Sequence, residues 1–196
     1  MSDAFIYDHV RTPRGKGKKD GSLHQASPVW LLRTLLKALE QRLSLDTGLV
    51  DDVVLGCVTP VGEQGADIAR TAVLDSEWAQ TVAGVTQSRF CASGLESINL
   101  AGAKVASGYE DLVVAGGVES MSRVPMMGFN PMPNPALAEK MPAAYISMGI
   151  TAENVAKKHG VSREDQDAFA LESHRRAGVV AARALTCMKG YPVQMA

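Results

Sequence analysis

Short runs of β-branched residues alternate along this chain with longer stretches of helical period, and this alternation constrains the fold more than any other feature. The short runs predict strands at residues 4–10, 52–58, 82–87 and 111–116. The second and fourth runs are almost continuously apolar, as expected of parallel strands that helices cover on both faces. The sequence therefore predicts an α/β fold of βαβ units around a mostly parallel sheet.

Two helices between these strands can be placed from local signals. Ser27 is a suitable N-cap and Pro28 a suitable first helical residue, and leucines follow at steps of three and four. The stretch after Cys91 is instead rich in small residues, which let another backbone approach closely. We expect this second helix to lie in the middle of the fold, with Gly94 and Gly102 at packing contacts.

Composition excludes several classes of protein. The chain has 196 residues, of which 46% are hydrophobic, enough for one large domain or two small ones. Its apolar runs fall far short of the roughly 20 residues that span a bilayer. Twenty basic residues against 21 acidic ones give no general attraction to nucleic acid. The three widely spaced cysteines fit neither a disulfide framework nor a zinc site, and the first residues fit no targeting signal. We therefore predict a cytoplasmic protein without a metal ion.

The character of the sequence changes after residue 118. Six of the nine methionines and five of the nine prolines lie between residues 119 and 150. We expect two domains, a core at residues 1–118 and a loop domain at residues 119–196. The methionine-rich segment is either a lid over an apolar ligand or a long loop packed on the core. Further helices are predicted from Thr151 to Gly160 and from the capping box that begins at Ser162.

Cys91 lies where a predicted strand gives way to the small-residue helix. A thiolate at a helix N-terminus faces unpaired backbone N–H groups and the positive end of the helix dipole. The same N–H groups could hold an oxyanion that forms when the thiolate attacks a carbonyl. This context alone leaves two interpretations open, an activated nucleophile or a buried and inert cysteine, and the second is the more common in proteins.

A basic segment at residues 11–19 is a second candidate site, because its glycines and cations could receive phosphates. It lacks the P-loop pattern, and a solvated loop explains the same residues. The GGVES run at residues 116–120 and the SRFCASG run around Cys91 also lack the spacings of a dinucleotide-binding loop and of a serine-hydrolase turn.

Four motifs in order resemble those of the thiolase family, and together they span residues 4 to about 177. They are VRTPRGKGKKDGSLH, SRFCASGLESI, AGGVESMSRVPM and MGITAENVAKKHGVSREDQDAFALESH. The resemblance implies a thiolase-like layered α/β fold and a CoA-dependent acyltransferase, with Cys91 as the acyl-accepting nucleophile. The expected reaction is thiolysis of a 3-oxoacyl-CoA or the reverse Claisen condensation. The loop domain would then cover the acyl pocket, with Met148 lining that pocket.

The sequence also departs from the family pattern. Family members are roughly twice this length, and their second half brings a His in a GHP motif, an Asn in an NEAF-like motif and a second Cys in a CxGxG motif. None of these strings is present, and the tail diverges from about residue 178. A truncation or a shifted reading frame would explain this, so we expect the C-terminal half to be absent and the isolated chain to be inactive. Two alternatives stay open: a non-catalytic remnant or interaction module, and a ketosynthase-like condensing enzyme, which the SRFCASG and GGVESMS motifs disfavour.

The resemblance also implies substrates and partners. Coenzyme A and acyl-CoA would be substrates, with no permanently bound cofactor. A homo-oligomer, dimer or tetramer, is expected, and a hydratase-dehydrogenase subunit of fatty-acid β-oxidation is a candidate partner. Ser147 stands before Met148 where short-chain biosynthetic relatives tend to have His, which favours degradative substrates longer than acetoacetyl-CoA.

Overall fold

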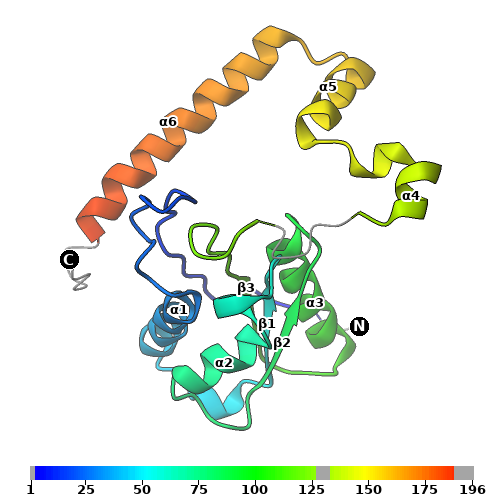
Figure 1. Ribbon diagram of the computed structural model, residues 1–196. Helices are drawn as coiled ribbons and strands as arrows, with labels where there is room; N and C mark the ends of the chain where they lie inside the picture. Colours follow the sequence, from blue (N-terminus) through cyan, green and yellow to red (C-terminus); the bar gives the residue numbers. More distant parts are fainter. Residues whose placement is uncertain (1–2, 127–132, 188–196) are drawn as a thin grey trace. The chain divides into compact units, whose positions relative to one another are not determined.

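A computed structural model describes residues 3–126 and 133–187, and the chain divides into two compact units, Met1–Asn130 and Pro131–Ala196. All strands of the described residues belong to the first unit, and the second contains only helices (Figure 1). The division falls within the methionine- and proline-rich segment, later in the chain than the domain boundary expected after residue 118.

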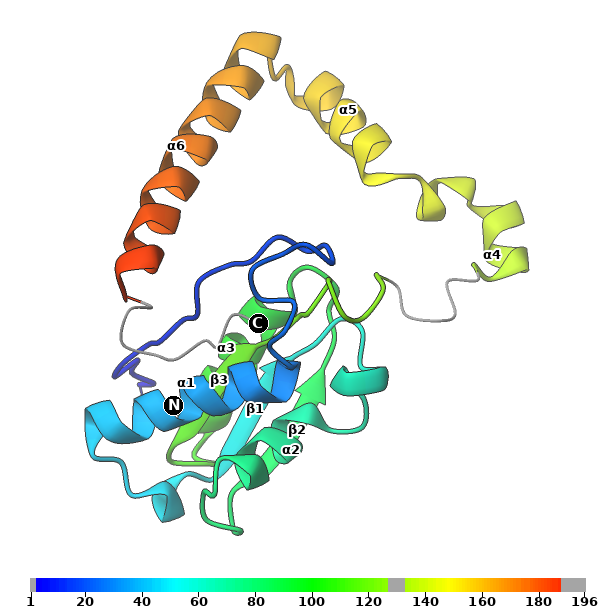
Figure 2. The same ribbon diagram turned by 60° about the vertical axis from the view of Figure 1, so that its left-hand side comes forward.

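The first unit is built on three parallel strands in the order β2-β1-β3, so that β1 lies in the centre (Figure 2). They are β1 (Asp52–Gly56), β2 (Ala83–Gln87) and β3 (Val113–Gly117). All five residues of β1 are buried, because strands flank it on both sides and helices cover its faces. Three of the four predicted strands and the α/β class are thus confirmed.

Helix α1 (Pro28–Leu43) begins as the sequence predicts. The Ser27 hydroxyl accepts a hydrogen bond from the N–H of Trp30 at 3.2 Å, and Pro28 occupies the first turn. The buried face of α1 belongs to the hydrophobic core between the helices and one face of the sheet. This core consists of Leu32, Leu36, Val50, Val53, Leu55, Cys57, Ile68, Ala69, Ala72, Val73, Trp78 and Val82.

Helix α2 (Ile68–Asp75) packs beside α1 and against β2, and it was not predicted. Its start is marked by Asp67, whose carboxylate accepts hydrogen bonds from the N–H groups of Ala69 and Arg70. The helix is only eight residues long, so its apolar period is too short to stand out. Two short 3-10 turns flank β1, η1 (Thr47–Leu49) and η2 (Gly62–Gln64).

Helix α3 (Ser93–Ser107) covers the other face of the sheet, against β1 and β3 (Figure 1). Its outer face is open, and Leu95 and Ile98 are 63% and 44% exposed. A Cβ built on Gly94 or Gly102 would meet no atom within 4 Å. No element of residues 3–126 covers this face, so the expected glycine contacts are not met within the first unit, and the central position of the helix remains a prediction.

Residues 3–10 form no strand, which corrects the prediction for residues 4–10. Phe5, Ile6 and Tyr7 are largely exposed, although an ion pair of 3.0 Å joins Asp8 to Arg42 of α1. A strand exists only through its ladder to a neighbour. The central strand is already paired on both edges and this segment pairs with neither outer strand, so its strand-forming residues stay irregular.

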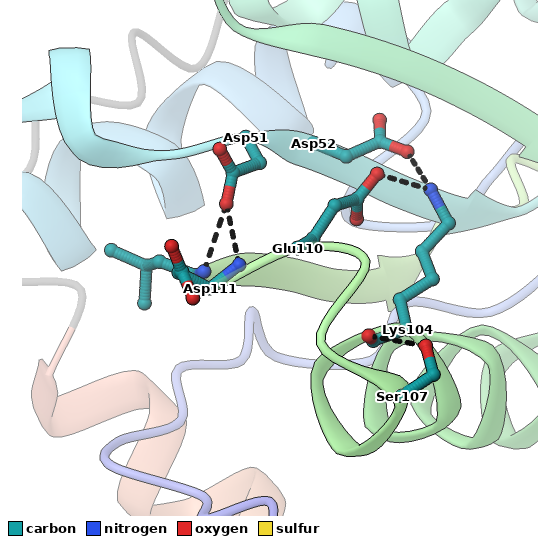
Figure 3. A network of polar contacts seen from close by, with 7 residues as sticks. Asp51, Asp52, Lys104, Ser107, Glu110 and Asp111 are labelled. Atoms are coloured by element: carbon teal, nitrogen blue, oxygen red, sulfur yellow. Dashed lines mark hydrogen bonds and ion pairs between the residues drawn. The ribbon is translucent and has the colours of Figure 1, made fainter.

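A partly buried cation joins the amino end of the sheet to α3 (Figure 3). The ammonium group of Lys104 contacts the carboxylates of Asp52, the first residue of β1, and of Glu110, the latter at 2.8 Å. The three groups come from separate segments and are mostly shielded from water. Lys104 therefore connects the helix, the central strand and the loop before β3.

The neighbouring Asp51 fastens the same loop from the strand side (Figure 3). Its carboxylate accepts hydrogen bonds from the backbone N–H groups of Leu112 at 3.0 Å and Asp111 at 2.8 Å. These two bonds lower the pKa of Asp51 below its ordinary value, and the bond from Leu112 makes the larger contribution. The start of β3 is thus held in register beside β1.

The second unit has no core of its own between residues 133 and 179. It contains α4 (Pro135–Lys140), the 3-10 turn η3 (Pro142–Tyr145), α5 (Met148–His159) and α6 (Arg163–Cys187). No residue between 133 and 179 is buried. Between residues 133 and 179 the helices of this unit thus bury no apolar face.

The helix termini of this unit follow the sequence signals. α5 begins at Met148, earlier than the expected Thr151, because the Ser147 hydroxyl caps it by accepting from the N–H of Ile150. It ends as predicted at Gly160, whose φ of 67° suits glycine. The predicted capping box at Ser162 precedes α6. That helix runs into the divergent tail, whose residues 188–196 lie outside the described part of the chain.

Candidate active site

Cys91 lies at the carboxyl edge of the parallel sheet. The three strands end in register, with Gly56 of β1 paired to Gln87 of β2 and to Gly117 of β3. Cys91 follows in the turn between β2 and α3, and it is an exposed free thiol. Open α/β sheets bind their ligands at this edge, so the thiol stands where a substrate would be received.

The turn that carries Cys91 is strained. Phe90 has a φ of 49°, a conformation that a bulky residue rarely adopts and that costs about 1–3 kcal/mol. Two backbone hydrogen bonds cross the turn, from Ala92 N–H to Arg89 O at 3.1 Å and from Ser93 N–H to Phe90 O at 2.9 Å. The chain therefore turns sharply between the strand and the helix, and Cys91 is exposed at the tip of this turn.

The first turn of α3 offers free hydrogen-bond donors beside Cys91. The helix has no side-chain N-cap, and within the described residues the backbone N–H groups of Gly94 and Leu95 have no partner. An ion pair of 2.7 Å joins Arg89, before the turn, to Glu96 in the first turn of the helix, so the charge of Arg89 is compensated there. Such N–H groups favour an anionic sulfur or oxygen, which is what nucleophilic attack on a carbonyl requires.

Two glycines stand at strand ends where there is no space for a side chain, Gly56 against the start of α3 and Gly117 against Gly56 itself. A Cβ on Gly56 would lie 2.5 Å from the carbonyl carbon of Ser93, and one on Gly117 would lie 2.9 Å from the carbonyl oxygen of Gly56. Any side chain at Gly56 would therefore displace the start of α3 and with it the Cys91 turn. The sequence analysis did not predict this role of Gly56. A glycine at the end of an apolar strand is the signal that could have indicated it.

The GGVES motif joins two loops at the same edge of the sheet. The Glu119 carboxylate accepts hydrogen bonds from the N–H of Val58 at 2.7 Å and from the side-chain amide of Gln64 at 2.9 Å. The amide oxygen of Gln64 in turn accepts from the N–H of Ser120. Gln64 is fully buried, so these bonds hold the loops after β1 and β3 against each other. The motif thus shapes the edge that carries Cys91.

Arg123, just beyond that motif, ties a third loop to this edge. Its guanidinium forms two hydrogen bonds of 2.6 Å with Glu63 and a third of 2.8 Å with the carbonyl oxygen of His24. The bonds from Arg123 lower the pKa of Glu63. Arg123 therefore connects the backbone at His24 to the turn that contains Glu63.

The basic segment lines one side of an open cavity of about 400 Å³. Residues 11–17 face leucines of α1 and residues 117–122 across this cavity. Lys16 is engaged in an ion pair of 2.7 Å with Asp20. The cavity lining is mostly apolar, whereas a phosphate-binding loop presents a row of backbone N–H groups, so this segment stays a basic loop without an assigned ligand.

Cys57 shows by contrast what an inert thiol looks like in this protein. It is 1% exposed, and burial, with a smaller contribution from the nearby charge of Glu119, raises its pKa to about 11. A thiol with that pKa is about 0.1% ionised at pH 8, and only the thiolate is nucleophilic. Cys57 is therefore a core residue, as its place in the apolar run at residues 52–58 predicts.

We expect iodoacetamide at pH 8 to alkylate Cys91 at least about 100-fold faster than Cys57, because Cys91 is exposed and Cys57 is both buried and protonated. The measurement is peptide mapping of the folded chain over time, in a Cys187→Ser background. Faster labelling of Cys57 than of Cys91 would contradict the assignment of Cys91 as the reactive thiol.

Met148, the other predicted site residue, belongs to the second unit. It is the first residue of α5 and is 73% exposed. Its predicted role in lining an acyl pocket therefore remains a prediction. Within residues 3–126 and 133–187, no group of three or more potential metal-binding side chains occurs, and no helix is long and apolar enough to cross a membrane.

A parallel sheet with an exposed thiol between a strand and a helix N-terminus has the architecture of α/β enzymes that use a nucleophile at the sheet edge. Comparison with known sequences gives the family: the family described as "Thiolase, N-terminal domain" matches residues 4–186. The chain belongs to the thiolase family.

Individual relatives agree with this assignment. The chain is 50% identical over 177 residues to a 3-ketoacyl-CoA thiolase of Bacillus subtilis, which covers 90% of this chain and 45% of the relative. A 3-ketoacyl-CoA thiolase of Shewanella denitrificans is 41% identical over 181 residues, covering 90% and 46%. The crystal structure of the Bacillus anthracis acetyl-CoA acetyltransferase superposes with a TM-score of 0.64 at 32% identity, covering 86% of this chain and 44% of that one. The chain thus spans about half the length of the relatives it matches.

Proposed function

We propose that this chain supplies the nucleophile half of a CoA-dependent acyltransferase, in which Cys91 carries the acyl group. The exposed position of Cys91 at the start of α3, in a member of the thiolase family, is the observation that carries the proposal. The relatives named 3-ketoacyl-CoA thiolase support a 3-oxoacyl-CoA as substrate. Coenzyme A and acyl-CoA then bind as substrates rather than as resident cofactors.

The proposed reaction proceeds in two steps. The Cys91 thiolate attacks the 3-keto carbon, a C–S bond forms, and the C2–C3 bond breaks with its electron pair leaving on acetyl-CoA, which takes up a proton. The thiolate of a second CoA then attacks the acyl-cysteine and releases the Cys91 thiolate. The free N–H groups at the start of α3 stabilise anionic species at the thiol. The family's His and second Cys, which move the protons, are not among the 196 residues.

The wider assignment follows from the same proposal. We propose a core domain at residues 1–118, a loop domain at residues 119–196 that covers the acyl pocket with Met148, and a role in fatty-acid β-oxidation in the cytoplasm. The partners would be a second copy of the chain in a dimer or tetramer and a hydratase-dehydrogenase subunit. A non-catalytic remnant that keeps the fold is the second candidate, and the departure of the sequence from the family pattern after about residue 178 is the observation that favours it.

Incubation with acetyl-CoA is expected to acetylate Cys91 slowly, with release of one CoA per chain and no further turnover. Transfer of the acetyl group from CoA sulfur to Cys91 sulfur needs only the exposed thiol. Continuous thiolysis needs general acid–base catalysis, whose loss typically costs about 10²- to 10⁴-fold in rate. Mass spectrometry of the intact chain and of its peptides measures the acetylation, and acetoacetyl-CoA consumption measures the turnover.

Two variants complete this experiment. Cys91→Ser should remove the acetylation, whereas Cys57→Ser should leave it unchanged because Cys57 is buried. An acetyl group on Cys57, or none on Cys91 in the folded chain, would favour the non-catalytic remnant. Robust acetoacetyl-CoA thiolysis that Cys91→Ser abolishes would show that the chain itself supplies the missing proton-transfer groups.

A further inference from the structure

We propose that Ser93 is a positioning residue for Cys91, because its hydroxyl closes the turn that holds the thiol at the amino end of α3. The inference rests on the proposed role of Cys91 as nucleophile and names a residue through which that role is maintained. Ser93 is itself 4% exposed, so it acts on Cys91 and not on a substrate.

The Ser93 hydroxyl bridges the two residues that precede Cys91. Its oxygen accepts a hydrogen bond from the N–H of Arg89 at 2.9 Å, and its proton is donated to the carbonyl oxygen of Phe90 at 2.6 Å. The chain from Arg89 to Ser93 is thereby closed into a ring that contains Cys91. One side chain thus fixes the backbone on the approach to the thiol.

This bridge matters because Phe90 is held at a φ of 49°. A bulky residue stays in that conformation only when its surroundings hold it there. Both bonds of the Ser93 hydroxyl act at or next to Phe90, so their loss lets the turn relax toward an ordinary φ. Cys91 then loses its fixed position relative to the free N–H groups of α3.

Ser93 is in turn anchored from the sheet. Its carbonyl oxygen accepts a hydrogen bond of 2.5 Å from the side-chain amide of Gln87, the last residue of β2. The backbone of Gly56 at the end of β1 packs directly against it, with no space for a side chain. Ser93 is therefore a fixed point to which a strained turn can be tied.

Ser97 provides a matched control on the same helix. It is fully buried, donates to the carbonyl oxygen of Ser93 at 3.0 Å and accepts from Gln87 at 3.0 Å. In the described structure its hydroxyl has no bond to residues 89–91. Ser97→Ala thus removes a buried serine hydroxyl from α3 without opening the Cys91 turn.

The test compares alkylation of Cys91 by iodoacetate and iodoacetamide, in a Cys187→Ser background and below the melting temperature of each variant. Free N–H groups at a helix N-terminus attract the carboxylate of iodoacetate. The rate constant for iodoacetate divided by that for iodoacetamide therefore reports where the thiol stands relative to these groups. Unfolding or simple exposure would move the ratio to that of a cysteine peptide measured alongside. We expect Ser93→Ala to lower the ratio about threefold and Ser97→Ala to leave it unchanged.

A rescue variant keeps the proposal open to refutation if Ser93→Ala folds poorly. Glycine adopts the Phe90 conformation without strain, so adding Phe90→Gly to Ser93→Ala should return most of the lost ratio. An unchanged ratio in Ser93→Ala, an equal loss in Ser97→Ala, or no return in the double variant would overturn the role of Ser93. A native chain whose ratio already equals that of the cysteine peptide would instead count against Cys91 as nucleophile.

Discussion

Replacing Lys104 with alanine is expected to lower the free energy of unfolding by about 3 kcal/mol, the low end of the range for breaking a buried ion pair, because the lysine keeps some contact with water. The substitution leaves the carboxylates of Asp52 and Glu110 close together, at 6% and 13% side-chain exposure, without their shared cation (Figure 3). One further oxygen of each carboxylate is already buried without a partner. Urea unfolding at pH 7 measures the change.

This loss should be constant from pH 6 to 9 and shrink above about pH 10. Partial burial lowers the pKa of Lys104, but its hydrogen bonds to Asp52 and Glu110 outweigh that effect, so the pKa in the folded state is raised. A raised folded-state pKa gives stability that is complete below the unfolded value of about 10.4 and disappears as the pH rises through the folded value.

Lys16→Ala is the matched control for this prediction. Lys16 also pairs with an aspartate, Asp20 at 2.7 Å, but both side chains are more than half exposed. Exposed pairs contribute about 0–1 kcal/mol, so this variant should unfold almost like the native chain. Adding Asp52→Asn to Lys104→Ala should recover part of the loss. An effect of Lys104→Ala no larger than that of Lys16→Ala would show that the three groups do not form a working ion-pair network.

The elements that the sequence predicted are those with local causes. Ser27 and Pro28 start α1 and Gly160 ends α5, because caps act within one turn of the chain. The apolar runs of β1 and β3 are visible because helices and strands surround them. Residues 4–10 have an equally good strand pattern and form none, since pairing depends on a neighbour that the pattern does not contain.

The candidate site shows the same division between local and long-range information. The position of Cys91 between strand and helix is readable, because it depends on the adjacent residues. The contacts that support the Cys91 turn cannot be read from the sequence. The N–H of Val58 donates to Glu119, 61 residues later in the chain, and Gly56 packs against Ser93. A glycine or glutamate in the sequence does not reveal which distant backbone it will meet. The roles of these residues therefore emerged only with the fold.

The face of α3 that no element of residues 3–126 covers is expected to make the 196-residue chain bind ANS and self-associate in a concentration-dependent manner. Leu95 and Ile98 lie one turn apart on this face, and the strained Phe90 is exposed beside its start. Burying a large apolar side chain is worth about 1.5–3 kcal/mol, so a few such residues supply a substantial part of the free energy of association. Gel filtration at several concentrations, together with ANS fluorescence, measures the effect.

Substitutions on α3 and on another helix separate this face from exposed apolar residues in general. The double variant Leu95→Gln and Ile98→Gln should reduce both ANS binding and association. Leu74→Gln on α2 should change neither, although Leu74 is 48% exposed, because it stands outside the α3 face. Gly94 and Gly102 leave open space on α3, which allows a covering backbone to approach closely. A compact monomer that melts cooperatively and binds no ANS would mean that the α3 face needs no covering element, and the expected position of this helix in the middle of a larger fold would then be wrong.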